Sequence, residues 1–405
     1  MIKSDRLLAR LDELARIGAT PQGGVNRPAL SPLDRAARSW LATAAQARGF
    51  ALYTDALANL FIRRDGRGPD RPPVLIGSHL DSQPSGGRFD GALGTLAAFE
   101  CLETLEDQGI ATDHPVEVVA WTNEEGSRFE PGTMGSKAFA GKAQVEDWLA
   151  VMDGSGARFG DELAATLAAL PQARPRPIGV PPHAYVELHI EQGQILEAER
   201  ITIGVVTGVQ GARWFNVVVD GEAAHAGTTP LSYRHDALAA AARLLAQLPP
   251  LMVADGTARL TCGRLVVEPG STNVIPGRVV FTIDSRHPEP ARLDAIEARI
   301  RAMAAAETTA RMTVERTLDL APCRFDPVIV AAIDQAAADL GLSRRHLPSG
   351  AFHDALHLAA ICPAGMIFVP CRGGISHNEA ESIVPDDAIA GTEVLLAVTR
   401  QLAGG

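Results

Sequence analysis

The chain has 405 residues, of which 46% are hydrophobic and 21% are charged, and its formal net charge is −11 at pH 7. This length predicts two domains, and the apolar content excludes a disordered chain. The acidic balance argues against nucleic acid or an anionic membrane as the main partner.

Residues 1–190 predict alternating helices and strands. Apolar residues at helical spacing, without a signal-peptide core, indicate a first helix ending near Gly18, and Ser31-Pro32 begins a second helix that runs through Ala47. Strands are expected at 59–63, 73–79, 115–122 and 184–190, and helices at 91–109, 133–140, 144–151 and 160–169. This alternation predicts an α/β sheet whose active site lies beyond the carboxyl ends of its strands.

The pattern changes near residue 208. A strand beginning at Trp214 is followed by a helix at 236–247, strands at 258–268 and 277–285, a helix at 291–306 and a strand at 311–317. This βαββαβ order predicts a ferredoxin-like domain over 209–321. A helix at 327–340 and an apolar run at 366–369 return to the α/β pattern. Residues 1–208 and 322–405 are therefore expected to form one discontinuous domain.

Five cysteines, none of them in a CxxC pair, predict reduced and mostly buried thiols. No apolar run approaches 18 residues, so no membrane span is expected. Both features predict a cytoplasmic protein.

Ligand-type side chains gather after the predicted strand at 73–79. His79 and Asp81 are two residues apart, so their side chains leave on one face, and Asp81 is predicted to accept the second N–H of a metal-bound imidazole. Asp90 lies in a GGRFDG loop, where a helix N-cap and a carboxylate that bridges two metal ions are the alternatives. The combination with His79 favours the bridge.

Three further sites follow later apolar runs. Glu124 and Glu125 can divide two tasks, metal binding and proton transfer from an attacking water to a leaving nitrogen, although a solvated acidic turn has the same pattern. In HIEQG, His189 and Glu191 compete as the metal ligand, and His377 supplies an imidazole from the far end of the chain. Zinc suits this donor set, with manganese, nickel or cobalt as alternatives.

Six motifs occur together in this order: GSHLDSQPSGGRFDG, TNEEGSRF, HIEQG, GEAAHAGTTPLSYRHDAL, PGSTNVIPGRV and GGISHNEAE. They resemble the dinuclear-metal amidohydrolases of the M20 peptidase-related family, in the branch of N-carbamoyl-L-amino-acid hydrolases, allantoate amidohydrolases and β-ureidopropionases. The resemblance covers nearly the whole chain. It implies a zinc-exopeptidase-like catalytic domain, interrupted by a ferredoxin-like lid that also forms a homodimer.

The resemblance also implies two divalent metal ions per subunit. It assigns to one ion the ligands His79 and His189, to the other Glu125 and His377, and to both the bridging Asp90. Glu124 would then be the catalytic base, with Asp81 beside His79. A non-proline cis peptide is expected after Asp90.

Polar residues of the inserted domain are predicted to bind substrate. Arg286 follows an apolar strand and suits the carboxylate of a small molecule. From its pattern alone, His225 is interpreted as a surface histidine. The resemblance implies instead that it stabilises the oxyanion, often across the dimer. It also implies that Gln192 and Asn273 contact the substrate. In SGAFHDA, Phe352 replaces a small residue of the family's SGAGHDA, beside His353, which is predicted to position substrate or to support the site.

The sequence therefore predicts a metal-dependent hydrolase of linear amides. It would cleave the ureido or carbamoyl group of an N-carbamoyl-L-amino acid or of allantoate, releasing ammonia, and CO2 from carbamoyl substrates. A dipeptidase or N-acyl-amino-acid deacylase is the alternative, disfavoured because such peptidases commonly carry an acidic residue in place of His189. A binding protein without metal is disfavoured by the complete set of ligands.

Overall fold

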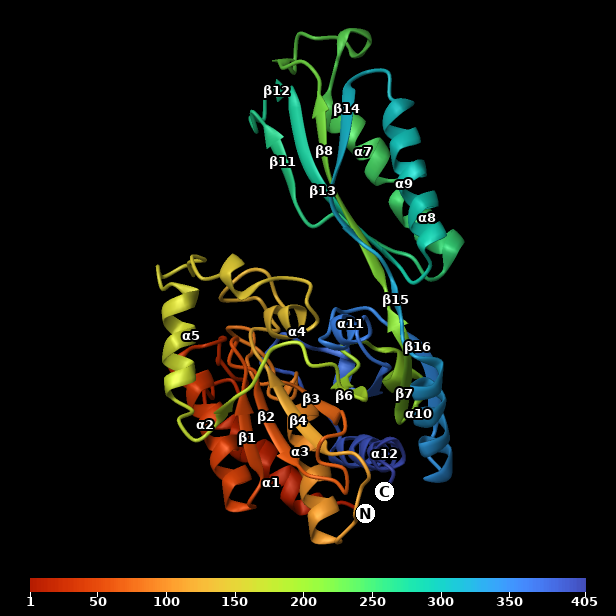
Figure 1. Ribbon diagram of the computed structural model, residues 1–405. Helices are drawn as coiled ribbons and strands as arrows, with labels where there is room; N and C mark the ends of the chain where they lie inside the picture. Colours follow the sequence, from red (N-terminus) through yellow and green to blue (C-terminus); the bar gives the residue numbers. More distant parts are fainter. The chain divides into compact units, whose positions relative to one another are not determined.

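The computed structural model describes residues 1–405, which divide into two units. The first unit consists of Met1–Gly208 and Arg324–Gly405, and the second of Val209–Cys323. Figure 1 draws the chain with its helices and strands labelled.

One mixed sheet of ten strands forms the centre of the first unit. Its order is β15-β7-β17-β6-β3-β4-β2-β1-β5, and β16 pairs with β7. The four central strands, β17, β6, β3 and β4, run parallel to one another, so their carboxyl ends meet at one edge. The strands are β1 (Ala51–Thr54), β2 (Leu60–Arg64), β3 (Val74–His79), β4 (Val116–Trp121), β5 (Arg174–Pro175), β6 (Ala184–Ile190), β7 (Ile203–Val209), β15 (Cys323–Arg324), β16 (Arg344–Ser349) and β17 (Ala364–Val369).

Helices cover both faces of this sheet. Side chains alternate along a strand, so Val116, Val118 and Ala120 of β4 face the core formed with α1, α2, α3, α10 and α12. Trp121 faces the other side, where its ring packs on Phe139 of α4. The helices are α1 (Ser4–Ala15), α2 (Pro32–Ala47), α3 (Ala92–Asp107), α4 (Met134–Phe139), α5 (Phe159–Ala168), α6 (Ile195–Glu199), α10 (Pro327–Asp339), α11 (Ala355–Leu358) and α12 (Pro385–Ala403).

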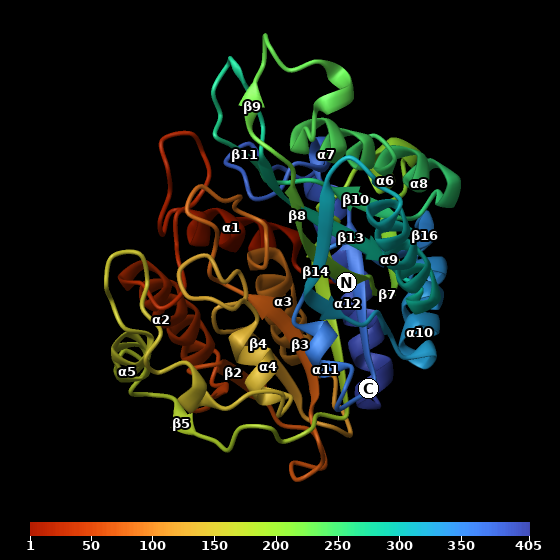
Figure 2. The ribbon, with the colours of Figure 1, turned by 90° about the horizontal axis from the view of Figure 1, so that it is seen from above.

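Local interactions explain where the early helices begin and pack. Ser31 ends the preceding loop and caps α2, since its hydroxyl accepts the backbone N–H of Asp34 at 3.2 Å. α5 lies beside α2, where Arg35 pairs with Glu162 at 2.9 Å (Figures 1 and 2).

The second unit is an antiparallel sheet with helices on one face. Its order is β10-β13-β8-β14, and β11 also pairs with β13. Alternate residues of β8 and β13, such as Val217 and Phe281, share a core with Ala240 of α7 and Ile300 of α9. A separate ladder joins β9 to β12. The elements are β8 (Gly211–Asp220), β9 (Ala224–His225), α7 (Ala237–Leu245), α8 (Leu248–Asp255), β10 (Arg259–Thr261), β11 (Leu265–Glu268), β12 (Val274–Ile275), β13 (Arg278–His287), α9 (Pro290–Ala305) and β14 (Arg311–Leu320).

One stretch of the second unit meets the length and composition criteria of a membrane span, which the sequence analysis did not expect. Ala237–Asp255 covers 19 residues with a mean hydropathy of 1.5. Ala237, Ala241 and Leu244 of this stretch pack into the core of the unit, and Arg243 pairs with Glu307 at 2.8 Å. Packing within the unit covers only part of this stretch, since 28% of the apolar window is buried.

The mixed α/β fold is confirmed, but some predicted elements are wrong. The helix expected at 144–151 is a single 3-10 turn, Val145–Asp147, whose N-terminus is capped by the Asp147 carboxylate, which accepts the Gln144 N–H at 3.0 Å. The strand expected at 258–268 is divided into β10 and β11. β1, β7, β16 and α12 had not been predicted.

Candidate metal centre

The carboxyl ends of the four parallel strands carry most of the predicted site. His79 is the last residue of β3, and His189 is the next-to-last residue of β6. Glu124 and Glu125 follow β4, and His377 lies in the loop that follows β17. Residues distant in sequence therefore meet at one edge of the sheet.

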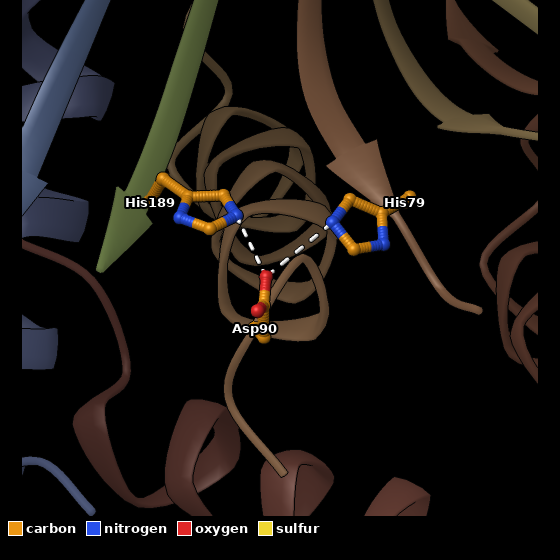
Figure 3. A group of neighbouring side chains, drawn as sticks. All are labelled: His79, Asp90 and His189. Atoms are coloured by element: carbon orange, nitrogen blue, oxygen red, sulfur yellow. Dashed lines mark ion pairs between the residues drawn. The ribbon is translucent and has the colours of Figure 1, made fainter. Parts of the chain in front are cut away.

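Two histidines lie on either side of Asp90 (Figure 3). The Asp90 Oδ1 atom is 3.0 Å from Nε2 of His189 and 3.5 Å from Nε2 of His79. Both imidazoles are 1% exposed, so solvent does not solvate them. The three residues form one group whose ligand atoms can hold a metal ion.

The other oxygen of Asp90 belongs to a second group. Asp90 Oδ2 is 3.3 Å from Nε2 of His377, and the same nitrogen is 3.4 Å from Glu125 Oε2. Asp90, Glu125 and His377 also have ligand atoms close enough to hold a metal ion. One carboxylate therefore offers one oxygen to each group.

Backbone carbonyls orient the two buried imidazoles. The His79 Nδ1 atom lies 2.9 Å from the carbonyl oxygen of Asp81, and the His189 Nδ1 atom lies 2.9 Å from that of Ile190. With the Nδ1 proton donated to a carbonyl, each Nε2 lone pair is directed at the Asp90 side.

The predicted partner of His79 needs correction. The carboxylate of Asp81 is 3.8 Å from Nδ1, too far for a hydrogen bond, because its two oxygens accept the backbone N–H groups of Glu124 at 3.3 Å and Glu125 at 3.2 Å. Asp81 therefore holds the loop that carries the two glutamates, and its main-chain oxygen binds the imidazole.

The chemistry of the site fits a divalent cation. The buried Nε2 atom of His79 has no hydrogen-bond partner, as expected of an atom that binds a metal. Burial and the charge of neighbouring carboxylates raise the pKa of Glu124 well above its usual range and that of Glu125 to about 7. Imidazole nitrogens and carboxylate oxygens are ligands that zinc accepts, and a cation would compensate the clustered negative charge.

Gly91 permits the close approach of the Asp90 loop to His79. Its φ angle is 63°, and a Cβ atom there would lie 2.3 Å from the His79 ring. The cis peptide expected after Asp90 is absent, because Gly91 makes the turn with a positive φ; the two cis peptides precede Pro131 and Pro269.

Glu191 is not part of either group. Its carboxylate accepts the backbone N–H groups of Ile195 at 3.0 Å and Leu196 at 2.9 Å, at the start of α6. Of the two competing residues of HIEQG, His189 is the one that faces Asp90.

Two residues predicted to bind substrate lie at the same edge. The Gln192 side chain donates to Asp90 Oδ2 at 2.8 Å, so it already contacts the centre of the site. The ring of His353 packs against that of His189 with centroids 4.5 Å apart, and its buried Nε2 atom has no hydrogen-bond partner. The adjacent Phe352 is half-buried.

Sequence reasoning missed Glu381, which joins two loops of the site. Its Oε1 atom accepts the backbone N–H groups of Phe89 at 2.9 Å and Asp90 at 3.1 Å. Its Oε2 atom accepts the Ser376 hydroxyl at 3.0 Å, and that hydroxyl lies 3.1 Å from Asp90 Oδ2. The position of Glu381 four residues after His377, in the motif GGISHNEAE, was the available signal.

The second unit holds the remaining predicted residues at two places. His225 and Asn273 are neighbours, because the Ala226 N–H donates to the Asn273 carbonyl at 3.0 Å. The Nδ1 atom of His225 accepts the N–H groups of Gly227 at 3.0 Å and Thr228 at 3.2 Å. The proton of the neutral ring is therefore on Nε2, which can donate to a ligand.

Arg286 lies far from this pair within the unit. β12 lies at the end of the sheet where β13 begins (Figure 1), and Arg286 is eight residues along β13 from Arg278. At roughly 3.3 Å per residue this is about 26 Å. The Arg286 guanidinium also has a carboxylate partner within its own strand, Asp284, at 2.9 Å.

Comparison with known proteins gives the class of this site. The family model described as "Peptidase family M20/M25/M40" matches residues 75–401. The chain is 42% identical to the N-carbamoyl-L-amino acid amidohydrolase of Geobacillus stearothermophilus, with all of both chains covered, and 37% identical to the allantoate amidohydrolase of Escherichia coli, with 96% of each chain covered. A hydantoinase/carbamoylase-family amidase of Burkholderia multivorans superposes with a TM-score of 0.94 at 45% identity, over 100% of this chain and 98% of that one.

The fold and the two ligand groups define a metal-dependent hydrolase. The chain belongs to peptidase family M20/M25/M40, in its amidohydrolase branch. The predicted family and branch are thereby confirmed.

Loss of the Glu381 carboxylate should weaken metal binding. In Glu381→Ala, the backbone of Asp90 and the Ser376 hydroxyl lose their common acceptor, and we expect metal affinity to fall about 10–100-fold, the usual effect of removing a group that orients ligands. Glu381→Gln keeps an acceptor oxygen and should lose less. Metal content measured against free zinc by mass spectrometry tests this, and equal affinity of Glu381→Ala and the parent chain would contradict it.

Proposed function

We propose that this protein hydrolyses the ureido or carbamoyl group of an N-carbamoyl-L-amino acid or of an allantoate-type substrate. The products are ammonia and the free amine, with CO2 from carbamoyl substrates. One observation carries the proposal: Asp90 lies between two ligand groups, beside a buried glutamate, in a chain whose full-length relatives carry these names. The five free cysteines support a cytoplasmic location.

The two ligand groups support two divalent ions per subunit, with zinc the first choice and manganese, cobalt or nickel as alternatives. His79 and His189 would bind one ion, Glu125 and His377 the other, and Asp90 both. Bound there, the ions would polarise the substrate carbonyl and lower the pKa of a water molecule.

Glu124 is the proposed general base. Its Oε2 atom is 3.5 Å from His79 Nε2, at the edge of the ligand groups, and its side chain is 9% exposed. The Asp81 carboxylate holds the Glu124 backbone by accepting its N–H. A buried carboxylate in this position can take a proton from the attacking water and deliver it to the leaving nitrogen.

The second unit is proposed to be a ferredoxin-like lid and dimerisation domain. Arg286 would bind the substrate carboxylate in exchange for Asp284, while Asn273 and the Nε2–H of His225 would contact the substrate and its oxyanion. Gln192 and His353 are proposed as the substrate contacts of the first unit.

The distance within the second unit supports a homodimer. Arg286 lies about 26 Å of strand beyond Arg278 on β13, whereas His225 pairs with β12, which precedes Arg278, so we expect that one copy cannot apply both side chains to a small substrate. Contributions from two copies of the chain would remove this conflict. We propose that His225 and Asn273 act on the substrate bound by the partner copy.

The substrate class can be tested on the zinc- or manganese-loaded protein. We expect ammonia release from allantoate, N-carbamoyl-β-alanine or N-carbamoyl-L-amino acids, lost on chelation and recovered with metal. N-carbamoyl-D-amino acids are the matched control, and dipeptides and N-acetyl-amino acids are assayed for free amine. Cleavage of the last two alone would move the protein to the dipeptidase or deacylase alternative.

Replacing the proposed base should separate chemistry from metal binding. For Glu124→Gln we expect unchanged metal content and a kcat reduced by about 10²–10⁴-fold, the usual contribution of acid–base catalysis. Glu13→Gln, on the exposed face of α1, removes the same charge far from the site and should leave kcat unchanged. Near-normal turnover by Glu124→Gln would refute the assignment.

A mixture of two inactive variants tests the dimer. His225→Ala and Glu124→Gln should each have little activity alone. If His225 acts on the partner's substrate, random exchange of subunits restores about one quarter of the parent activity, because half of the dimers are mixed and each contains one intact site. No recovery after verified exchange would mean that His225 does not act across the dimer.

A further inference from the structure

A small pocket of the first unit lies outside the metal centre. It encloses about 220 Å³ between the end of α6, the segment that follows β17 and the first turn of α12. Such a volume is below the roughly 300–1,000 Å³ of a drug-sized site, so it suits a small metabolite. We call this cavity the α6 pocket. Its lining includes the apolar Leu196, Ile201 and Pro370 and the charged Glu197, Arg200, Arg372 and Asp387.

The charged groups of the α6 pocket have no ionic partners. The side chains of Arg200, Arg372 and Asp387 form no hydrogen bond or ion pair, with one another or with other residues. A nearby arginine, Arg345, does form an ion pair, with Glu199. Arg200 and Arg372 differ from it in having no such partner. The Glu197 carboxylate, which also lines the pocket, already accepts the Gly373 N–H, so the two guanidinium groups and the Asp387 carboxylate offer both signs of charge to a ligand.

We propose that the α6 pocket is a second binding site, for a small zwitterion of the α-amino-acid class. Its carboxylate would lie between Arg200 and Arg372, since guanidinium groups match carboxylate geometry, and its ammonium would face Asp387. Its apolar side chain would cover Leu196 and Ile201. The inference extends the proposed function, because an α-amino acid is the product of N-carbamoyl-amino-acid hydrolysis.

Short stretches of the chain join the α6 pocket to the metal centre. The Gly373 N–H donates to Glu197 at 2.6 Å, and the Gln194 side chain donates to the Gly373 carbonyl at 3.1 Å. These bonds tie α6 to the 3-10 turn Arg372–Gly374 (η3). Gln192 lies shortly before the first segment and His377 shortly after the second. A ligand held by Arg200 and Arg372 would therefore restrain both loops and change turnover.

Calorimetric titration of the full-length, metal-loaded protein tests the site. The probes are L-valine, isovalerate, which lacks the amino group, and isobutylamine, which lacks the carboxylate. We expect saturable valine binding that weakens by about tenfold or more in Arg200→Gln and in Arg372→Gln, the scale of a lost charge-assisted hydrogen bond. Arg16→Gln, which removes an exposed arginine of the same unit outside the pocket, should bind valine normally. Asp387→Asn should weaken valine but not isovalerate.

The outcomes separate this inference from the proposed function. Absent valine binding, or equal binding by Arg200→Gln, Arg372→Gln and the parent chain, would overturn it. Isovalerate binding as tightly as valine would overturn the zwitterion and leave a simple anion site. The titration needs no turnover, so failure to hydrolyse ureido compounds would not affect it. With an active substrate, valine should change kcat in the parent chain and not in Arg372→Gln.

Discussion

The structure depends on the burial of one carboxylate among imidazoles. Asp90 is 6% exposed, and its oxygens lie 3.0–3.5 Å from ring nitrogens of three histidines. Taking a carboxylate out of water costs several kcal/mol unless positive charge and hydrogen bonds compensate it. The ends of β3 and β6 supply two of these imidazoles, and Gly91 must lack a side chain because a Cβ atom there would lie 2.3 Å from the His79 ring.

Two buried arginines far from the chemistry hold the strand ends in place. Arg38 pairs with Asp34 and donates to the Trp121 carbonyl at 2.9 Å, at the end of β4. Arg27 donates to the Leu80 carbonyl at 2.7 Å, after β3, and burial lowers its pKa to about 10. Carbonyl groups that leave a sheet inside a protein need donors, and these guanidinium groups supply them. The ligands of the centre therefore rest on contacts made by the first two helices and the loop between them.

Strand ends alone predicted that His79, His189 and the Glu124–Glu125 pair would lie at one edge, because parallel strands deliver their last residues there. The family resemblance then assigned the two ligand groups and chose His189 over Glu191, so these ligands could be grouped without coordinates. Glu381 could not, since its bond to the Asp90 backbone spans 291 residues and joins two loops of irregular geometry. The partner of His79 was also beyond prediction: a spacing of two residues does not distinguish the Asp81 carboxylate from its carbonyl. The sequence predicted an α/β pattern for one part of the chain and an alternation of strands and helices for the other. It did not predict short edge strands such as β1 and β16, because so few residues show no clear alternation of polar and apolar side chains.

Metal binding and catalysis make different demands on this chain. All ligand atoms of both groups come from the first unit, so the metal centre requires no second copy. The proposed substrate groups of the second unit lie too far apart within one copy to grip a molecule the size of an N-carbamoyl amino acid. An isolated chain would then bind its ions and lack a complete substrate site. Association of two chains would supply the missing groups, so that turnover depends on protein concentration while metal content does not.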